Sequence, residues 1–279
     1  MRAHFVELGG VRTRYLRAGD GPPVFLLHGV GMTADSWVKN IGPLSERFSV
    51  YAPDLLGCGF TECGVPSTEA PQLAIVQHLE NLADSLDLQT FSVIGSSLGG
   101  LIASLAYLQM PGRIDRLVIV GAASLLAATR DELRGVFEAS HKNGGRAFAD
   151  NSISGHRQRL ANLVTDVRSI PSTALHMQIN AYGLPWAQSS YERRITGLIA
   201  HLKESPDAWV MDRLEKIEVP VLLIAGKNDP RTSPAWEDLA SLRLPRAERM
   251  MFENCGHFPH LEYPDEFNAA VQRFLQQQA

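Results

Sequence analysis

A glycine-rich turn that contains two serines, Gly95 to Gly100, is the part of this sequence best suited to nucleophilic chemistry. It lies between an apolar run typical of a buried strand, Phe91 to Ile94, and a run typical of a helix, Leu98 to Leu108. A Gly-x-Ser-x-Gly turn between a strand and a helix exposes a serine hydroxyl as a nucleophile. Such a hydroxyl attacks carbonyl carbon atoms when a neighbouring base removes its proton.

Spacing decides which of the two serines is the nucleophile. The turn is so tight that the positions two residues before and two residues after the nucleophile must be small. With Ser97 as the nucleophile both positions are glycine, whereas with Ser96 they are Ile94 and Leu98. We therefore predict that Ser97 is the nucleophile, and we place Ser96 among the candidate substrate-binding residues.

An acid and a base follow at two later turns. Asp229 comes directly after the predicted strand Val221 to Ala225, and His257 lies in the loop after the last predicted strand. In a triad with Ser97, His257 removes the serine proton and Asp229 orients the histidine ring. A second histidine, His260, is a rival base, but we expect it to line the pocket or lie at the surface.

Two backbone N–H groups are expected to stabilise the oxyanion that forms during acyl transfer. One belongs to Leu98, the residue after the nucleophile, and the other to Val30 in the loop after the predicted strand Val24 to Leu27. For His28 we prefer a structural role, in which its hydrogen bonds hold this loop. Asp54 likewise is expected to cap the backbone donors of its own turn.

The elements that position these residues alternate between short apolar runs and helix-like segments. This pattern predicts a mostly parallel sheet of about eight strands with helices on both faces, an α/β fold. The first two strands, His4 to Leu8 and Val11 to Leu16, are predicted to form an antiparallel hairpin at the edge. The remaining predicted strands are Val24 to Leu27, Phe48 to Ala52, Phe91 to Ile94, Leu117 to Val120, Val221 to Ala225 and Met250 to Phe252.

The alternation stops over residues 122–214, where the sequence is helix-like and shows no convincing strand. We predict an inserted helical lid there, between a first core segment (1–121) and a second one (215–279). Such an insertion would cover the carboxyl ends of the strands, where open α/β sheets bind ligands. Breaks between its helices are expected at Asn143-Gly144-Gly145, Pro171, Pro185 and Pro206. Its helices carry Phe137, Phe148, Leu175, Met177, Tyr182 and Trp186, which either face the pocket or pack against one another, core packing being the expected role for most of them. Trp186 is also a candidate substrate contact.

The composition limits the classes of partner. A chain of 279 residues with 45% hydrophobic and 20% charged residues is typical of a globular protein, and its formal charge of -4 gives no attraction to nucleic acid or anionic membranes. The three cysteines show no metal or redox spacing, and neither a secretion signal nor an apolar span is evident, so we expect a cytoplasmic protein with no cofactor or metal. Its partner would be a small-molecule substrate, and the oligomeric state, homodimer included, stays open.

The combined motifs resemble the α/β-hydrolase superfamily over the whole chain apart from the lid. They are His28-Gly29, Asp54-x-x-Gly57-x-Gly59, Gly95-x-Ser97-x-Gly99-Gly100, Asp229 and Gly256-His257. The segment Ala52 to Glu62 is similar to the meta-cleavage-product hydrolases, which break a carbon–carbon bond in dienoates. The resemblance therefore implies two chemistries for one triad.

Several residues depart from the carbon–carbon hydrolases. Those enzymes carry asparagine before the nucleophile, where this chain has Ser96, and tryptophan after the catalytic histidine, where it has Phe258. Their dienoate-binding lid arginine has no unique counterpart here, the candidates being Arg168, Arg193 and Arg194. We therefore expect a serine hydrolase that cleaves carboxylic esters of small, largely apolar substrates, with Phe258 and Arg193 as further candidate substrate contacts. Carbon–carbon hydrolysis is the alternative, and a non-catalytic ligand sensor is a third hypothesis.

Overall fold

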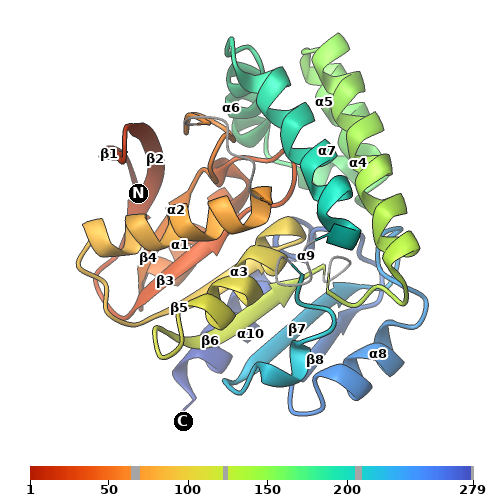
Figure 1. Ribbon diagram of the computed structural model, residues 1–279. Coiled ribbons are helices and arrows are strands. Elements are labelled where there is room, and N and C mark those ends of the chain that lie inside the picture. Colours follow the sequence, from red (N-terminus) through yellow and green to blue (C-terminus); the bar gives the residue numbers. More distant parts are fainter. Residues whose placement is uncertain (64–69, 122–124, 205–208, 278–279) are drawn as a thin grey trace.

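The computed structural model describes residues 1–63, 70–121, 125–204 and 209–277 and contains an eight-stranded sheet (Figure 1). The strands are β1 (Arg2–Leu8), β2 (Val11–Ala18), β3 (Pro23–Leu27), β4 (Ser49–Pro53), β5 (Phe91–Ser96), β6 (Ile114–Val120), β7 (Val221–Gly226) and β8 (Glu248–Phe252). Their order across the sheet is β1-β2-β4-β3-β5-β6-β7-β8. The β1–β2 hairpin forms one edge, β2 pairs antiparallel with β4, and all other pairs are parallel. The predicted sheet and its edge hairpin are confirmed.

Helices cover both faces because successive strand side chains point to opposite sides of the sheet. Phe25 and Leu27 of β3 join the core on one face, whereas Val24 and Leu26 join the core on the other. The first face is covered by α2 (Pro71–Ser85), α3 (Leu98–Gln109) and α8 (Trp236–Arg243), and the second by α1 (Val38–Ser45) and α10 (Pro264–Gln276). Two short helices, η1 (Ala34–Trp37) and α9 (Pro259–Glu262), lie in the loops after β3 and β8.

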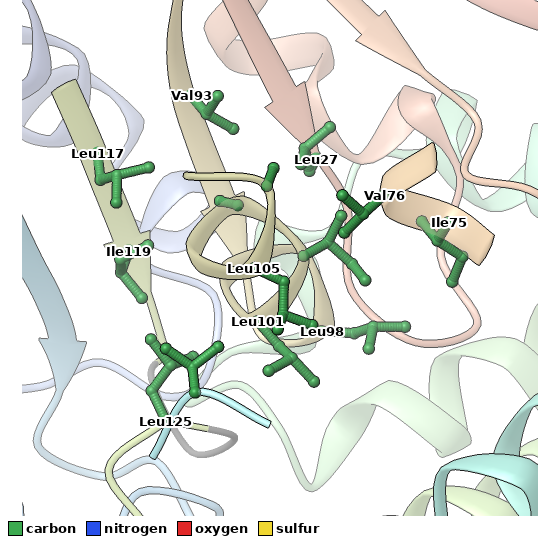
Figure 2. Close-up of a cluster of buried hydrophobic side chains, with 14 of the residues drawn as sticks. Leu27, Ile75, Val76, Val93, Leu98, Leu101, Leu105, Leu117, Ile119 and Leu125 are labelled. Atoms are coloured by element: carbon green, nitrogen blue, oxygen red, sulfur yellow. The ribbon is translucent and has the colours of Figure 1, made fainter. Parts of the chain in front are cut away.

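The helix that follows the predicted nucleophile is held by the larger of these cores. Leu101 and Leu105 of α3 lie between the side chains of β5 and β6 and those of α2 (Figure 2). All residues of α3 from Leu98 to Ala106 are buried. Burial of this many apolar side chains fixes the start of α3, and therefore the turn before it, relative to the sheet.

A group of helices follows β6 and gathers on one side of the sheet (Figure 1). It consists of α4 (Arg130–Ala149), α5 (Ile153–Ala161), η2 (Val167–Ser169), α6 (Ser172–Tyr182) and α7 (Ala187–Glu204), whereas η4 (Leu214–Lys216) directly precedes β7. The part of the predicted insertion that is described, residues 125–204 and 209–214, contains no strand. No helix in the described part of the chain combines the length and the apolar character needed to cross a bilayer.

One predicted break within this helical group is wrong. Helix α4 continues through Asn143-Gly144-Gly145, and α7 packs closely against Gly144, where a Cβ atom would lie 2.2 Å from the Tyr191 ring. Glycine therefore serves close helix packing here and does not end the helix. Pro171 precedes α6 and Pro185 lies between α6 and α7, as predicted, and Pro206 lies outside the described residues.

Candidate active site

The turn between β5 and α3 has the strained geometry that the sequence predicts for a nucleophilic serine. Ser97 has φ of 54° and ψ of −114°, a conformation that residues with a side chain rarely adopt. A Cβ atom at Gly95 would lie 2.2 Å from the Gly99 carbonyl oxygen, and one at Gly99 would lie 2.2 Å from that of Leu27. The Ser97 N–H donates to the Val120 carbonyl at 2.8 Å and so ties the turn to β6. Glycine on both sides of Ser97 is therefore required for steric reasons.

Asp229 and His257 meet beyond the carboxyl ends of β7 and β8. The Nδ1 of His257 lies 2.7 Å from Oδ2 of Asp229, and both side chains are buried. Burial alone would raise the pKa of the Asp229 carboxyl, but the His257 ring and hydrogen bonds from Thr232 and the Arg231 N–H outweigh it and lower that pKa. Because an ionised carboxylate only accepts hydrogen bonds, Nδ1 must carry the proton, which leaves Nε2 of the neutral ring able to accept one.

Ser97 and His257 line one cavity. The loop after β3 contributes Val30 to the same wall, and Phe258 adds an aromatic ring. The full lining is Gly29, Val30, Met32, Ser97, Ser140, Asn143, Arg159, Leu160, Leu163, Tyr191, Arg231, His257 and Phe258. The structure thus brings together the predicted nucleophile, the predicted base and one predicted oxyanion residue.

Leu98 is the first residue of α3, and its side chain is buried in the core (Figure 2). The first N–H groups of a helix have no acceptor within the helix, and they carry the positive end of its dipole. The N–H of Leu98, directly after Ser97, therefore has the character that stabilisation of an oxyanion requires.

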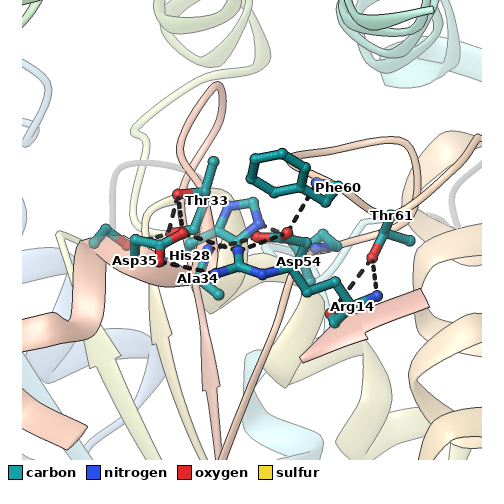
Figure 3. Close-up of polar contacts among 10 residues, drawn as sticks. Arg14, His28, Thr33, Ala34, Asp35, Asp54, Phe60 and Thr61 are labelled. Atoms are coloured by element: carbon teal, nitrogen blue, oxygen red, sulfur yellow. Dashed lines mark hydrogen bonds and ion pairs between the residues drawn. The ribbon is translucent and has the colours of Figure 1, made fainter. Parts of the chain in front are cut away.

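Two buried side chains hold the loop that carries Val30, and both expected structural roles are confirmed. Nδ1 of His28 lies 2.9 Å from the Gly29 carbonyl oxygen, and its Nε2 accepts from the Leu55 N–H at 3.0 Å. Burial lowers the pKa of His28, so the ring is neutral and Nδ1 is the donor. Asp54 accepts from the N–H groups of Ala34 at 2.7 Å and Phe60 at 2.9 Å (Figure 3).

A buried arginine completes this framework (Figure 3). Arg14 of β2 donates from Nη1 to Asp54 at 3.1 Å and forms a two-pronged pair with Asp35, at 2.8 and 2.9 Å. Burial alone would lower the pKa of Arg14, but the two carboxylates outweigh it and raise that pKa above its ordinary value. The network joins β2, η1 and the turn after β4, and it thereby holds the η1 end of the Val30 loop.

A second cavity adjoins the first, and four aromatic side chains are part of its wall. It shares Met32 and Tyr191 with the first cavity. Its wall includes the candidate substrate contact Trp186 and two more of the aromatic candidates, Phe148 and Tyr182. The other candidates in the helical group line neither cavity: for example, Phe137 packs against Trp209 in the core.

Three sequence-based expectations are corrected by the structure. Ser96, the last residue of β5, is 1% exposed and lines neither cavity. Arg193 lies on the exposed side of α7 next to Cys63, and one helical step turns Arg194 inward, where it lines the second cavity. His260 lines neither cavity and is not at the surface: it is buried, with its ring 4.2 Å from that of Trp37.

Sequence reasoning missed the residues that connect the helical group to the site. The Gly31 carbonyl accepts from Arg159 Nη2 at 3.0 Å, from Tyr182 at 3.1 Å and from Gln178. The Gly57 carbonyl accepts in the same way from Ser190 at 2.9 Å and Arg194 at 3.0 Å. A sequence signal exists for two pairs of these donors, because Gln178 and Tyr182 on α6, and Ser190 and Arg194 on α7, are each four residues apart and therefore share one helix face.

The chain matches the family model for the alpha/beta hydrolase fold over residues 22–264. It is 31% identical over 254 residues to the pimeloyl-[acyl-carrier protein] methyl ester esterase of Nitrosomonas europaea, covering 89% of this chain and 94% of that protein. It is also 27% identical over 283 residues to the 2-hydroxy-6-oxo-6-(2'-aminophenyl)hexa-2,4-dienoic acid hydrolase of Metapseudomonas resinovorans, covering 99% and 91%.

Among solved structures, a meta-cleavage product hydrolase of Pseudomonas fluorescens superimposes with a TM-score of 0.78 at 26% identity. The match covers 98% of this chain and 97% of that one. It spans the sheet and the helical group alike, so the similarity is not confined to the core. The chain therefore belongs to the α/β-hydrolase fold family, and it is an enzyme of the hydrolase class.

Proposed function

We propose that this protein is a serine hydrolase that cleaves carboxylic esters of small substrates through an acyl-enzyme on Ser97. The observation that carries the proposal is the single cavity that Ser97, His257 and Val30 share, together with the 2.7 Å contact between His257 and Asp229. The ester-cleaving relative at 31% identity supports the same chemistry.

The proposed reaction has two halves. Nε2 of His257 takes the proton of Ser97 as the Oγ atom attacks the ester carbonyl, and Asp229 stabilises the imidazolium that results. The N–H groups of Val30 and Leu98 hold the oxyanion. His257 then protonates the departing alkoxide, and a water molecule, activated by the same ring, hydrolyses the acyl-enzyme and releases the acid.

The helices α4 to α7 are proposed to form the lid of this site. Supporting observations are the cavity-lining side chains that they contribute and the hydrogen bonds from Arg159, Gln178 and Tyr182 to the Gly31 carbonyl, next to Val30. We assign the expected preference for apolar substrate groups to the second cavity, which contains Trp186. Burying an apolar part of the substrate against its aromatic side chains is favourable.

The direct test compares Ser97→Ala with Ser96→Ala in the hydrolysis of p-nitrophenyl acetate and butyrate. We expect Ser97→Ala to reduce kcat by at least about 10³-fold, because the nucleophile is lost. Ser96→Ala should retain activity within about tenfold of the original protein, and circular dichroism checks that both variants fold. Equal loss in both variants, or loss only in Ser96→Ala, would contradict the assignment.

Carbon–carbon hydrolysis is the second candidate. The relative from Metapseudomonas resinovorans and the superposition on a meta-cleavage product hydrolase favour it. One assay distinguishes the two reactions: the absorbance of a yellow 2-hydroxy-6-oxo-dienoate is followed in parallel with ester hydrolysis. Bleaching with a kcat/KM well above that for any ester would favour carbon–carbon cleavage. A non-catalytic sensor would fail to react with a fluorophosphonate probe.

A further inference from the structure

Two arginines line the cavity that contains Ser97, and neither is needed for the triad. Arg159 comes from α5 and is 7% exposed, and Arg231 lies in the loop after β7. They are close enough for each charge to act on the other: burial is the main cause that lowers the pKa of Arg231, and Arg159 lowers it further. Two guanidinium groups therefore face one small, partly desolvated space.

The carboxylates around this cavity do not balance the two charges. Asp229 lies next to Arg231, which also donates to the Val136 carbonyl at 3.3 Å and to Ser140, but Asp229 is at the same time hydrogen-bonded to His257. No carboxylate among the described residues forms an ion pair with Arg159. Among Arg159, Arg231 and Asp229, one positive charge therefore remains in excess beside the nucleophile.

The hydrogen bonds of Arg159 leave part of its guanidinium unused. In the described part of the chain its donors reach only neutral acceptors, the Gly31 carbonyl at 3.0 Å and the Met32 sulfur at 3.4 Å, both from Nη2. Its Nε is fully buried and has no hydrogen-bond partner among the described residues. A buried cation without an anion is unfavourable, and an anionic ligand in the cavity would remove that cost.

We propose that this cavity binds a carboxylate of the substrate, so that the preferred esters are those that carry a free carboxylate group. The inference rests on the proposed ester hydrolysis and names the substrate class of that site. Arg159 and Arg231 present the charge, and their planar forks match a carboxylate. Asn143, on the same wall, supplies an additional donor.

The other arginines considered from the sequence lie outside the cavity that contains Ser97. Arg168 is exposed and paired with Asp166 at 2.8 Å. Arg194 lines the second cavity, where its donors are directed to the Gly57 carbonyl and to the Cys58 sulfur, at 3.0 and 2.6 Å. Arg194 is likewise buried with no carboxylate partner among the described residues, but only Arg159 and Arg231 line the cavity that contains Ser97.

Matched pairs of esters test the proposal. For a carboxylate on the acyl side, monomethyl glutarate is compared with dimethyl glutarate, and on the alcohol side, 4-acetoxybutyrate is compared with its amide. We expect the original protein to prefer the charged member of at least one pair by about 10- to 100-fold in kcat/KM, the range of one charged hydrogen-bonded pair. The pair that shows the preference tells which side of the ester the carboxylate occupies.

Variants assign the preference to the arginines. Arg159→Met and, separately, Arg231→Met should abolish most of the preference, measured as the ratio of kcat/KM within each pair, so that any general loss of activity cancels. Arg168→Met, a change of equal charge at the surface, is the matched control and should leave the preference intact. Arg159→Lys keeps the positive charge but lacks the planar guanidinium group. It should retain an intermediate preference for the charged ester, which separates a charge effect from a folding defect.

Binding gives a readout that does not depend on turnover. Titration calorimetry of the Ser97→Ala protein should show glutarate binding that weakens in the Ser97→Ala, Arg159→Met double variant, whereas neutral glutaramide should not bind in either. Equal kcat/KM for charged and neutral esters, with no glutarate binding, would overturn the proposal while ester hydrolysis itself stands. Loss of the proposed function would instead appear as ester turnover that does not depend on Ser97.

Discussion

The His257 ring is held by Asp229 through one buried contact of 2.7 Å between Nδ1 and Oδ2, although 28 positions separate them in the chain. The contact fixes the ring with its Nε2 available as a base. Asp229→Asn keeps the size of the side chain but offers an amide that favours the wrong tautomer. We expect kcat to fall by about 10³- to 10⁴-fold with little change in KM. Steady-state kinetics on p-nitrophenyl butyrate measure this, and a loss below tenfold would contradict the role of Asp229.

The glycines around Ser97 make a prediction about stability. In Gly99→Ala the added Cβ atom would lie 2.2 Å from the Leu27 carbonyl oxygen, so β3 or α3 must shift. We expect a loss of at least about 2 kcal/mol in the free energy of unfolding, from overpacking and backbone displacement, and loss of activity.

Gly135→Ala is the matched control for this change. Gly135 lies inside α4 with no atom within 4 Å of an added Cβ, so alanine should stabilise the helix by about 0.5–1 kcal/mol. Urea unfolding of both variants provides the comparison. Equal stability of the two proteins would show that the turn is looser than described.

The buried network around Asp54 predicts a coupled loss of stability and activity. Asp54→Ala removes the acceptor of the Ala34 and Phe60 N–H groups and one partner of buried Arg14. We expect the free energy of unfolding to fall by about 3–5 kcal/mol, the range for breaking a buried ion pair. Because the network holds the Val30 loop, kcat should fall as well, even under conditions in which the variant remains folded. Unchanged kcat in the folded variant would separate the network from the site.

Features of the fold and of the site that depend on residues close together in the sequence could be predicted, whereas features that depend on contacts between distant segments could not. The turn at Ser97, the roles of His28 and Asp54, and the sheet with its edge hairpin depend on local patterns, and the structure agrees with them. The break predicted at Gly144 was wrong because a contact with another helix, at Tyr191, explains the glycine.

The candidate substrate contacts were harder to predict for the same reason. To decide whether Arg193 or Arg194 faces a cavity, one must know how α7 is rotated about its axis. No local motif fixes that rotation. Arg159 and Arg231 are separated by 72 positions along the chain, and only the folded arrangement brings their charges to one cavity.

Stability should depend on pH through a buried histidine outside the site. Burial lowers the pKa of His78, whose Nε2 lies 2.9 Å from the Thr13 hydroxyl, from 6.5 to about 4. Between pH 6.5 and pH 4 the unfolded chain binds a proton that the folded one does not, so the free energy of unfolding falls as the pH falls through this range. The contribution of His78 is up to about 3 kcal/mol at pH 4.

His78→Gln isolates this effect, because glutamine does not titrate and can still form a hydrogen bond with Thr13. Urea unfolding of both proteins at several pH values should show a shallower loss of stability for the variant between pH 6.5 and pH 4. Parallel curves for the two proteins would mean that His78 is not the group that titrates.

The covalent intermediate gives the sharpest measurement on the proposed mechanism. The protein is mixed with p-nitrophenyl acetate, quenched with acid during the first turnovers, digested and analysed by mass spectrometry, with fragmentation of the peptide that contains Ser96 and Ser97. We predict an acetyl group on Ser97, present in Ser96→Ala and absent in Ser97→Ala. An acetyl group on Ser96, or turnover that proceeds with no acyl group on either serine, would contradict the mechanism.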